Sequence, residues 1–125
     1  MADPRHTLGR QAEDAAAAWL QAQGWTVLAR RYRHPSGGEV DLIALDVRGA
    51  LVGVEVRARR SWRAGGPEES VDGRRVRRIA RTLAAFAAAS GARHTGLRID
   101  LVAAQPIGSV ETPQLRLRRL PNLEG

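Results

Sequence analysis

The chain has 125 residues, a length that predicts a single domain over residues 1–120 and a frayed tail over residues 121–125. It contains no cysteine, which excludes disulfides and thiol nucleophiles, and no apolar run approaches the ~18 residues that a membrane span needs. Twenty basic and 13 acidic residues give a net charge of +7, so we expect a cytoplasmic protein that binds no membrane and whose partner is a polyanion, above all nucleic acid.

The N-terminal part of the chain predicts a helix followed by a strand. Residues 8–23 carry apolar side chains at helical spacing, and Gly24 is a typical stop. Residues 25–33 are rich in strand-forming residues and end at turn-forming residues 34–38. The apolar face of the helix consists of Leu8, Ala12, Ala15, Ala16, Trp19 and Leu20.

The centre of the chain predicts an antiparallel hairpin. Residues 39–46 and 51–57 are both strand-like and are separated by a very short turn. If residues 47–49 form a three-residue loop, with Gly49 in its left-handed position, Asp46 pairs with Ala50. That register is a hypothesis, because a two-residue loop would shift every pair by one residue.

The second half predicts a loop, a helix and two strands. The loop spans residues 59–69, and a helix capped by Ser70 or Asp72 runs to residue 90, with Gly91 beyond its end. Strands are expected at residues 97–103 and, at an edge of the sheet, 114–120. The buried face of this helix is predicted to consist of Val76, Ile79, Ala80, Leu83, Phe86 and Ala87. The element order predicts an α/β fold, in which a mixed sheet is flanked by helices.

Acidic residues inside the apolar hairpin are the strongest functional signal. In the register above, Asp41 lies opposite Glu55, and Glu39 lies opposite Arg57. Two facing carboxylates repel one another unless a cation lies between them, and Mg²⁺ accepts one or two carboxylates together with water and phosphate oxygens. The spacing therefore favours metal-assisted phosphodiester hydrolysis. The alternative is a cross-strand ion pair of Glu39 with Arg57, with Asp41 and Glu55 exposed.

A basic surface is predicted on the second helix and on the loop before it. Arg74, Arg77, Arg78 and Arg81 fall on one stripe opposite the apolar face, and Arg59 and Arg60 follow the hairpin. Like charges four residues apart destabilise a helix, and a phosphate backbone would relieve that repulsion. A solvated helix face is the alternative. Trp62, in the loop, is interpreted as a loop anchor or as a stacking partner for an unpaired base.

Several segments resemble one known family. These segments are residues 9–13 (GRQAE), 38–44 (GEVDLIA), 54–59 (VEVRAR), 70–72 (SVD) and 98–102 (RIDLV). With them the sequence resembles the bacterial YraN-like proteins, a family of predicted endonucleases that is itself similar to archaeal Holliday junction resolvases of the restriction-endonuclease-like PD-(D/E)XK superfamily. Each segment is weak alone, but the set occurs in the right order over residues 7–103.

The resemblance implies an αβββαβ core and assigns roles to individual residues. It implies that Asp41, Glu55 and the backbone carbonyl of Val56 bind Mg²⁺ or Mn²⁺ and that Glu13 contributes from the first helix. The family pattern assigns no role to Glu39, which we interpret as a residue that supports the ligands without binding the metal. Arg57 stands where the superfamily has a lysine that positions or activates the attacking water. Arginine stays protonated and cannot act as a base, although it can offset phosphate charge.

Three functional hypotheses follow. The first is a metal-dependent DNA endonuclease acting on branched or damaged DNA. Because the resembled resolvases act in pairs on symmetric junctions, a homodimer is one oligomeric state that this hypothesis allows. The second is a nuclease-fold module that binds nucleic acid but cuts weakly or not at all, because of Arg57. The third, weaker hypothesis is an adaptor whose basic helix binds an acidic protein surface.

Overall fold

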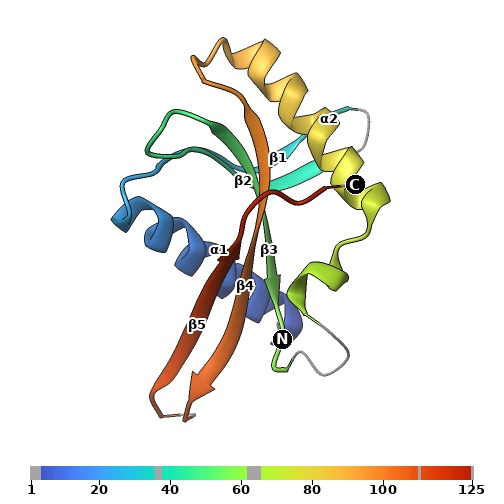
Figure 1. Cartoon of the computed structure of the whole chain (residues 1–125). Helices are drawn as coiled ribbons and strands as arrows, with labels where there is room; N and C mark the ends of the chain where they lie inside the picture. The colour runs from blue at the N-terminus through green and yellow to red at the C-terminus, as the bar shows by residue number, and fades with distance from the viewer. Residues whose placement is uncertain (1–3, 36–37, 62–65, 110, 125) are drawn as a thin grey trace.

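The computed structural model describes residues 4–35, 38–61, 66–109 and 111–124, so Trp62 lies outside the described residues. Two helices and five strands follow the predicted order, and a short 3₁₀ helix, η1, precedes the second helix (Figure 1). The elements are α1 (Pro4–Ala22), β1 (Thr26–Arg33), β2 (Glu39–Leu45), β3 (Leu51–Ala58), η1 (Pro67–Ser70), α2 (Gly73–Ser90), β4 (Leu97–Gly108) and β5 (Pro113–Leu120).

The strands form one mixed sheet in the order β1-β2-β3-β4-β5. Neighbouring strands are antiparallel except β3 and β4, which run parallel and are joined by the crossover through η1 and α2. A parallel pair needs such a long connection, whereas the antiparallel pairs are joined by short turns. The predicted α/β class, with a mixed sheet flanked by helices, is confirmed.

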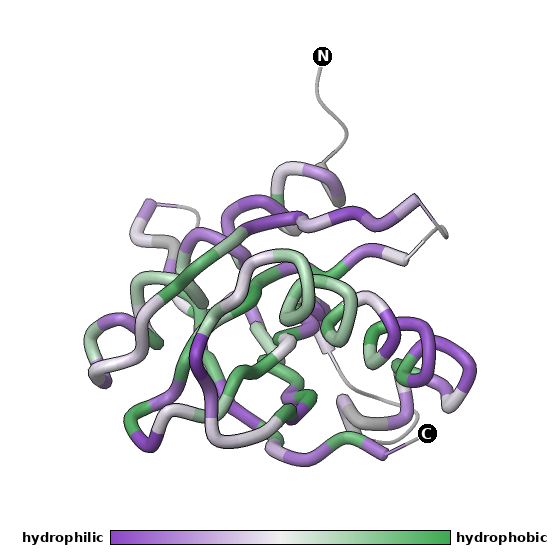
Figure 2. Tube along the Cα trace, turned by 90° about the horizontal axis from the view of Figure 1, so that it is seen from above, coloured by the Kyte–Doolittle hydropathy of each residue, from purple (hydrophilic) through white to green (hydrophobic). Residues whose placement is uncertain are grey.

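Each helix covers a different face of the sheet. On one face, Ala16 and Leu20 of α1 pack with Leu42, Val52 and Val54. The other face forms a second core with α2, whose buried residues are Val76, Ile79, Thr82 and Leu83. Figure 2 shows the hydrophobic residues gathered toward the middle of the trace and hydrophilic residues on the outer turns. Because both faces are covered, the central strands are apolar on both sides.

The buried face of α2 differs from the prediction at one position. Ala80 is exposed, and Thr82 is buried in its place. Ile79, Thr82 and Phe86 therefore face the sheet. The rings of Phe86 and Tyr32 meet edge-on, with their centroids 5.1 Å apart. Asp72 caps the helix by accepting the Arg75 backbone N–H, as one of the two predicted caps, and Gly91 ends it in the left-handed conformation.

The strand β4 is longer than predicted, because pairing with β5 continues past Pro106 to Gly108. Proline lacks an N–H and is tolerated at a sheet edge. Beyond Ala104, β4 has β5 on one side only, since β3 ends at Ala58. The resulting β4–β5 hairpin projects beyond the body of the molecule (Figure 1).

Asn122 and Leu123, which follow β5, are attached to β4 by hydrogen bonds. The Asn122 N–H donates to Asp100 Oδ1 at 3.1 Å, and the Leu123 N–H donates to the Ile99 carbonyl at 2.8 Å. Leu123 also packs against the core beneath α2. No helix within the described ranges has the length and apolar character required to cross a membrane.

Candidate functional site

The register of the β2–β3 hairpin is the predicted one. Leu45 pairs with Leu51, Leu42 pairs with Val54, and the Asp46 N–H donates to the Ala50 carbonyl at 3.0 Å. Gly49 has φ +87°, so the loop is the three-residue form that needs a left-handed residue. This register directs Asp41 toward Glu55.

The two strands separate at the position of the acids. The backbone ladder ends at Leu42 and Val54, and beyond it the Val56 N–H donates to the Asp41 carboxylate at 2.8 Å. Val40 and Ile43 both belong to the core beneath α2, although simple alternation would place them on opposite faces. The strand β2 therefore changes its twist at Asp41, and a side chain replaces the backbone partner that β2 would have offered to β3.

Asp41, which is half-buried, and Glu55, which is buried, form a carboxylate pair with unequal ionisation. Glu55 is only 2% exposed. Burial is the largest cause that raises the pKa of Asp41 to about 8. The hydrogen bond between Asp41 and Glu55 and the negative charge of Glu55 also raise this pKa. Asp41 therefore holds a proton at neutral pH, and its O–H donates a hydrogen bond to the Glu55 carboxylate.

Arginines hold the Glu55 carboxylate in its charged form. Burial by itself raises the pKa of Glu55, but hydrogen bonds from Asp41 and Arg75 outweigh burial, and the net pKa is lowered. Arg75 Nε, from the first turn of α2, donates to Glu55 Oε2 at 2.7 Å. Arg57 is farther away, with its Nη2 3.8 Å from the same oxygen. Each carboxylate oxygen of Glu55 thus faces positive charge from α2.

Glu13 reaches the region from α1 but pairs elsewhere. Its carboxylate accepts a hydrogen bond from Arg31 Nε at 2.7 Å. Its negative charge also raises the pKa of Asp41, which places it near the carboxylate pair. Arg31 has φ +49°, a left-handed conformation that is rare for a residue with a side chain. Strain at Arg31 thus accompanies the contact that orients Glu13.

Glu39 does not pair with Arg57 in the manner that the predicted cross-strand ion pair requires. The β2–β3 ladder has already ended at Leu42, so Glu39 and Arg57 are no longer ladder neighbours. Glu39 faces β1 instead, where its Cα partner is Arg33, and the two side chains form an ion pair with Nε and Oε2 3.4 Å apart. The predicted ion pair of Glu39 with Arg57 is therefore wrong, and Glu39 pairs with Arg33 of β1 instead.

The donor set at the end of the hairpin suits a divalent cation. Asp41 and Glu55 supply two carboxylates that interact through a hydrogen bond and by charge. The N–H and C=O of a strand residue point to the same side, so the Val56 carbonyl faces the side on which Asp41 accepts the Val56 N–H. Two carboxylates and one carbonyl are ligands that Mg²⁺ accepts. Among the described residues, however, no group of three His, Asp or Glu side chains is close enough to form a metal cluster, so Glu13 does not complete one.

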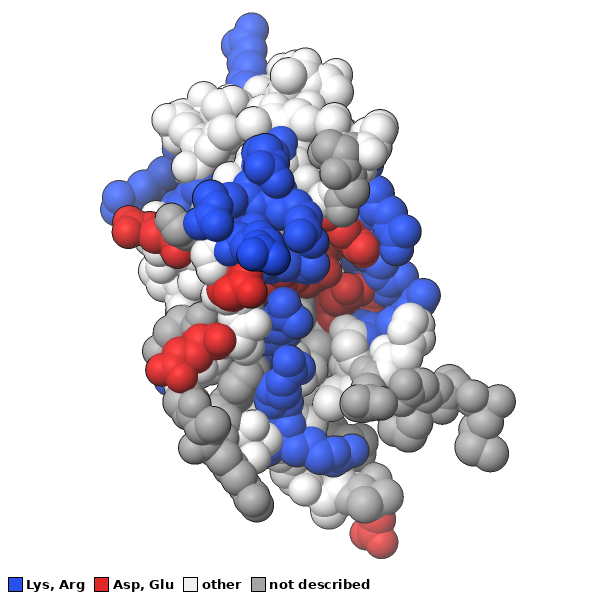
Figure 3. All heavy atoms as spheres, turned by 90° about the vertical axis from the view of Figure 1, so that its right-hand side faces the viewer, with Lys and Arg blue, Asp and Glu red and all other residues white. Residues whose placement is uncertain are grey.

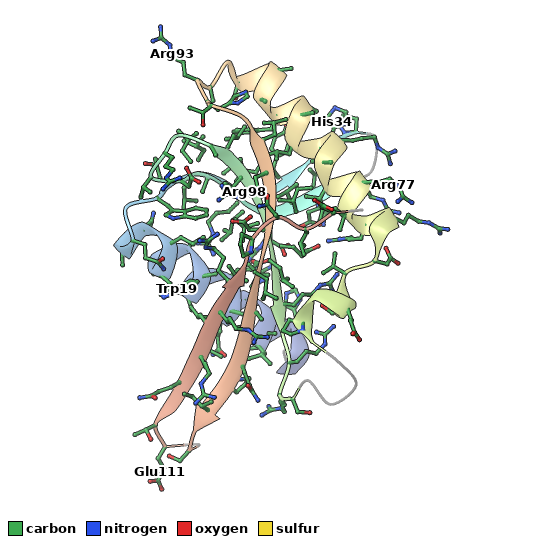
Figure 4. The ribbon with its side chains drawn as sticks, viewed as in Figure 1. Trp19, His34, Arg77, Arg93, Arg98 and Glu111 are labelled. Atoms are coloured by element: carbon green, nitrogen blue, oxygen red, sulfur yellow. The ribbon has the colours of Figure 1, made fainter. Side chains whose placement is uncertain are left out.

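Four of the six predicted basic residues belong to α2, and the other two follow β3. Figure 3 shows basic side chains gathered in a patch over α2, with acidic side chains at its border. Arg74, Arg77 and Arg81 are exposed and Arg78 is half-buried. Arg77 lies on the outer side of the helix (Figure 4). Arg59 and Arg60, both exposed, follow directly after β3.

Comparison with known proteins gives this fold and site a family. The model described as "Uncharacterised protein family UPF0102" matches residues 12–104, which include the second half of α1, the hairpin, α2 and most of β4. The chain belongs to the UPF0102 family. This agrees with the predicted YraN-like resemblance, whereas the nuclease superfamily remains a proposal.

Curated relatives support the membership over most of the chain. A UPF0102 protein of Anaeromyxobacter dehalogenans is 43% identical over 101 residues, which are 81% of this chain and 74% of the relative. One from Symbiobacterium thermophilum is 42% identical over 99 residues, 79% of this chain and 82% of the relative. One from Prosthecochloris aestuarii is 41% identical over 98 residues, 78% of this chain and 76% of the relative.

Arg75 contacts the carboxylate pair of the UPF0102 chain, although the sequence pattern does not predict it as a site residue. The predicted stripe contained its neighbours and left Arg75 out, yet Arg75 is the arginine that binds Glu55. A signal was present in the spacing, because Arg75 precedes Ile79 by four residues and Thr82 by seven. That spacing puts Arg75 on the side of α2 that faces the sheet.

Asp100, in the RIDLV segment of the UPF0102 chain, belongs to a structural network instead of the site. It is fully buried and accepts hydrogen bonds from Arg98 Nε at 2.8 Å, Arg119 Nη1 at 2.9 Å and the Asn122 N–H. Arg98 also donates to Asp46 at 2.8 Å, and Figure 4 shows Arg98 at the centre of the molecule. This network joins the hairpin turn, β4, β5 and the C-terminal segment.

Proposed function

We propose that this UPF0102 protein is a metal-dependent endonuclease that hydrolyses phosphodiester bonds of DNA, with branched or damaged DNA as its substrate and the cytoplasm as its location. The observation that carries the proposal is the pair of half-buried Asp41 and buried Glu55 at the point where β2 leaves β3. A buried pair of carboxylates is costly to the fold, and a pKa raised to about 8 is typical of functional sites.

The residues at the end of the hairpin would hold the metal and the substrate in distinct ways. Asp41, Glu55 and the Val56 carbonyl would hold Mg²⁺ or Mn²⁺, which supplies an activated water and offsets the charge that develops on the phosphate. Asp41 must lose its proton before it can act as a ligand. Glu13, oriented by Arg31, and Glu39 would adjust the negative potential around this pair.

Arg57 would act on the phosphate and not on the water. Its guanidinium is permanently charged, so it cannot accept a proton from the attacking water. It can donate paired hydrogen bonds to phosphate oxygens and stabilise the charge of the transition state. Its Nη2 lies 3.8 Å from Glu55, which places it beside the proposed metal ligands.

A cleavage assay on linear, flapped and four-way-junction DNA with Mg²⁺ or Mn²⁺ tests the proposal. We expect the wild type to cut at least one substrate and Asp41→Asn to lose at least a hundredfold in rate. Asp14→Asn is the matched control, because Asp14 is an exposed acid on α1 that pairs with Arg30 and should cut like the wild type. If the wild type leaves all substrates intact with either metal, the nuclease proposal fails for them.

A second candidate is a nuclease-fold module that binds nucleic acid without cutting it. Two observations favour it: Arg57 stands in the place of the superfamily lysine, and Arg75 already neutralises Glu55. Under this proposal the wild type shifts DNA in a gel but does not cut it, and Arg57→Lys gains metal-dependent cleavage. A homodimer on symmetric junctions is tested in the same samples by sedimentation with and without junction DNA.

A further inference from the structure

A pocket of about 210 Å³ lies beside the carboxylate pair, between the start of α2 and the end of β3. We call it the arginine pocket. Its lining consists of Arg57, Ser70, Asp72, Arg74, Arg75 and Arg78. Arg57 and Arg75 also face Glu55, so the pocket and the carboxylate pair share a wall. Its volume exceeds that of a phosphate group, and its mouth is open to solvent.

Positive charge in the arginine pocket exceeds what its own acid can neutralise. Among the described residues Asp72 is the single acid of the lining, and its carboxylate already accepts the Arg75 backbone N–H at 2.8 Å as the helix cap. Arg75 is paired with Glu55. Among the described side chains, no acid forms an ion pair with Arg74 or Arg78. The first turn of α2 adds the positive end of the helix dipole.

Arg57 gives an independent sign that an acceptor belongs here. Its Nε is buried and has no hydrogen-bond partner among the described residues. Buried donors in folded proteins are nearly always bonded, so this one calls for an acceptor, and an oxygen of a ligand in the adjoining pocket would supply it. The guanidinium plane matches the paired oxygens of a phosphate, and here several guanidinium groups meet at one pocket.

We propose that the arginine pocket binds one phosphate group of a nucleic acid strand, next to the phosphate that the carboxylate pair would process. The second half of this statement rests on the proposed function, whereas phosphate binding by the pocket does not. The proposal divides the predicted stripe on α2 into two classes. Arg74 and Arg78 bind the phosphate directly, and Arg77 and Arg81, which do not line the pocket, contribute only to the general field.

A titration without any divalent metal tests the proposal. The probe is a fluorescent five-nucleotide single-stranded DNA with a 5′-phosphate or a 5′-hydroxyl, and binding is followed by anisotropy in EDTA. We compare Arg74→Gln/Arg78→Gln with Arg77→Gln/Arg81→Gln, since each double variant removes two charges from the same helix. The first should bind at least about tenfold more weakly than the second, as expected for loss of charge-assisted hydrogen bonds.

The outcomes separate the pocket from a diffuse charge effect. A preference of the wild type for the 5′-phosphate, lost in the Arg74/Arg78 variant, supports a pocket for a terminal phosphate. Equal binding of both probes, weakened in the same variant, supports a pocket for a backbone phosphate. Equal weakening in the two double variants, with unchanged thermal unfolding of both, overturns the proposal. Because no metal is present, failure of the cleavage assay leaves this result intact, and the reverse also holds.

Discussion

Asp41 and Glu55 are two neighbouring acids with opposite pKa shifts, and the cause is the unequal supply of positive charge. Glu55 faces Arg75 at 2.7 Å and Arg57 at 3.8 Å, so it keeps its charge despite burial. Asp41 accepts a hydrogen bond from the Val56 N–H and lies farther from the arginines, and burial beside Glu55 raises its pKa to about 8. At this scale, arginines from two elements decide which acid holds the proton.

The shift at Asp41 predicts how stability depends on pH in the metal-free protein. The folded chain keeps a proton on Asp41 that the unfolded chain releases above about pH 4. The free energy of unfolding should therefore fall as the pH rises from about 4 to about 8. The lowered pKa of Glu55 acts differently, since its contribution is lost only as the pH falls below the usual carboxyl range.

Asp41→Asn tests this dependence, because an amide imitates the protonated acid. We expect the variant to lose most of the decline in stability between pH 5 and pH 8, measured by urea unfolding in EDTA. Parallel curves for wild type and variant over that range would show that Asp41 titrates normally in the folded protein.

Arg75 should compete with a divalent cation for Glu55. Arg75→Gln leaves a buried carboxylate with less positive charge, which should cost about 1–2 kcal/mol of unfolding free energy for a partly exposed arginine. Adding 10 mM Mg²⁺ should restore more stability to this variant than to the wild type, because the cation no longer displaces a guanidinium. Thermal unfolding with and without Mg²⁺ measures the difference, and equal shifts in both proteins would exclude the competition.

Between elements, the contact of α2 with the start of β2 depends on the absence of a side chain at Gly38. A Cβ built there would lie 1.9 Å from Thr82 Oγ1 and 3.3 Å from the Arg78 carbonyl. Thr82 is fully buried and donates its hydroxyl to that carbonyl at 3.0 Å. The glycine thus lets α2 approach the strand that carries Asp41.

Gly38→Ala should lower the free energy of unfolding by about 1–3 kcal/mol through this overpacking. Gly9→Ala is the control, since Gly9 lies in α1 with no atom within 4 Å of the added Cβ, and alanine there should stabilise by about 0.5–1 kcal/mol. In the double variant Gly38→Ala/Thr82→Ala part of the loss should be recovered. Additive losses in urea unfolding would show that Thr82 is not the source of the clash.

At the scale of the whole molecule, the network around Asp100 connects segments far apart in the chain. Arg98 links Asp100 to Asp46 at the hairpin turn, and Arg119 links it to β5. Both guanidinium groups also lie over the Trp25 ring, at 5.8 and 5.3 Å from its centroid. The network therefore holds the β2–β3 turn, the start of β4 and the end of β5 together.

Asp100→Asn should remove about 3–5 kcal/mol of stability, because two arginines then face a neutral amide at a buried position. Asp14→Asn, which breaks an exposed ion pair, should change stability little. Chemical unfolding measures both variants. A loss at Asp100 no larger than that at Asp14 would mean that the network adds nothing to stability.

Patterns that are local in the chain determined the α/β class, the element order and the hairpin register. Apolar spacing marked both helices, and the short turn with Gly49 allowed a three-residue loop that brought Asp41 next to Glu55. These features depend on residues close in sequence. The family resemblance rested on the same local segments and led to the UPF0102 family.

The tertiary structure alone decided what each charged residue contacts. Arg75 binds Glu55 across 20 residues, Arg31 binds Glu13 across 18, and Arg98 binds Asp46 across 52. Glu39 turned from Arg57 to Arg33 because β2 and β3 separate, and the length of β4 followed from its pairing with β5. An arginine side chain is long and flexible, so its partner is set by the packing of whole elements and not by its position in the sequence.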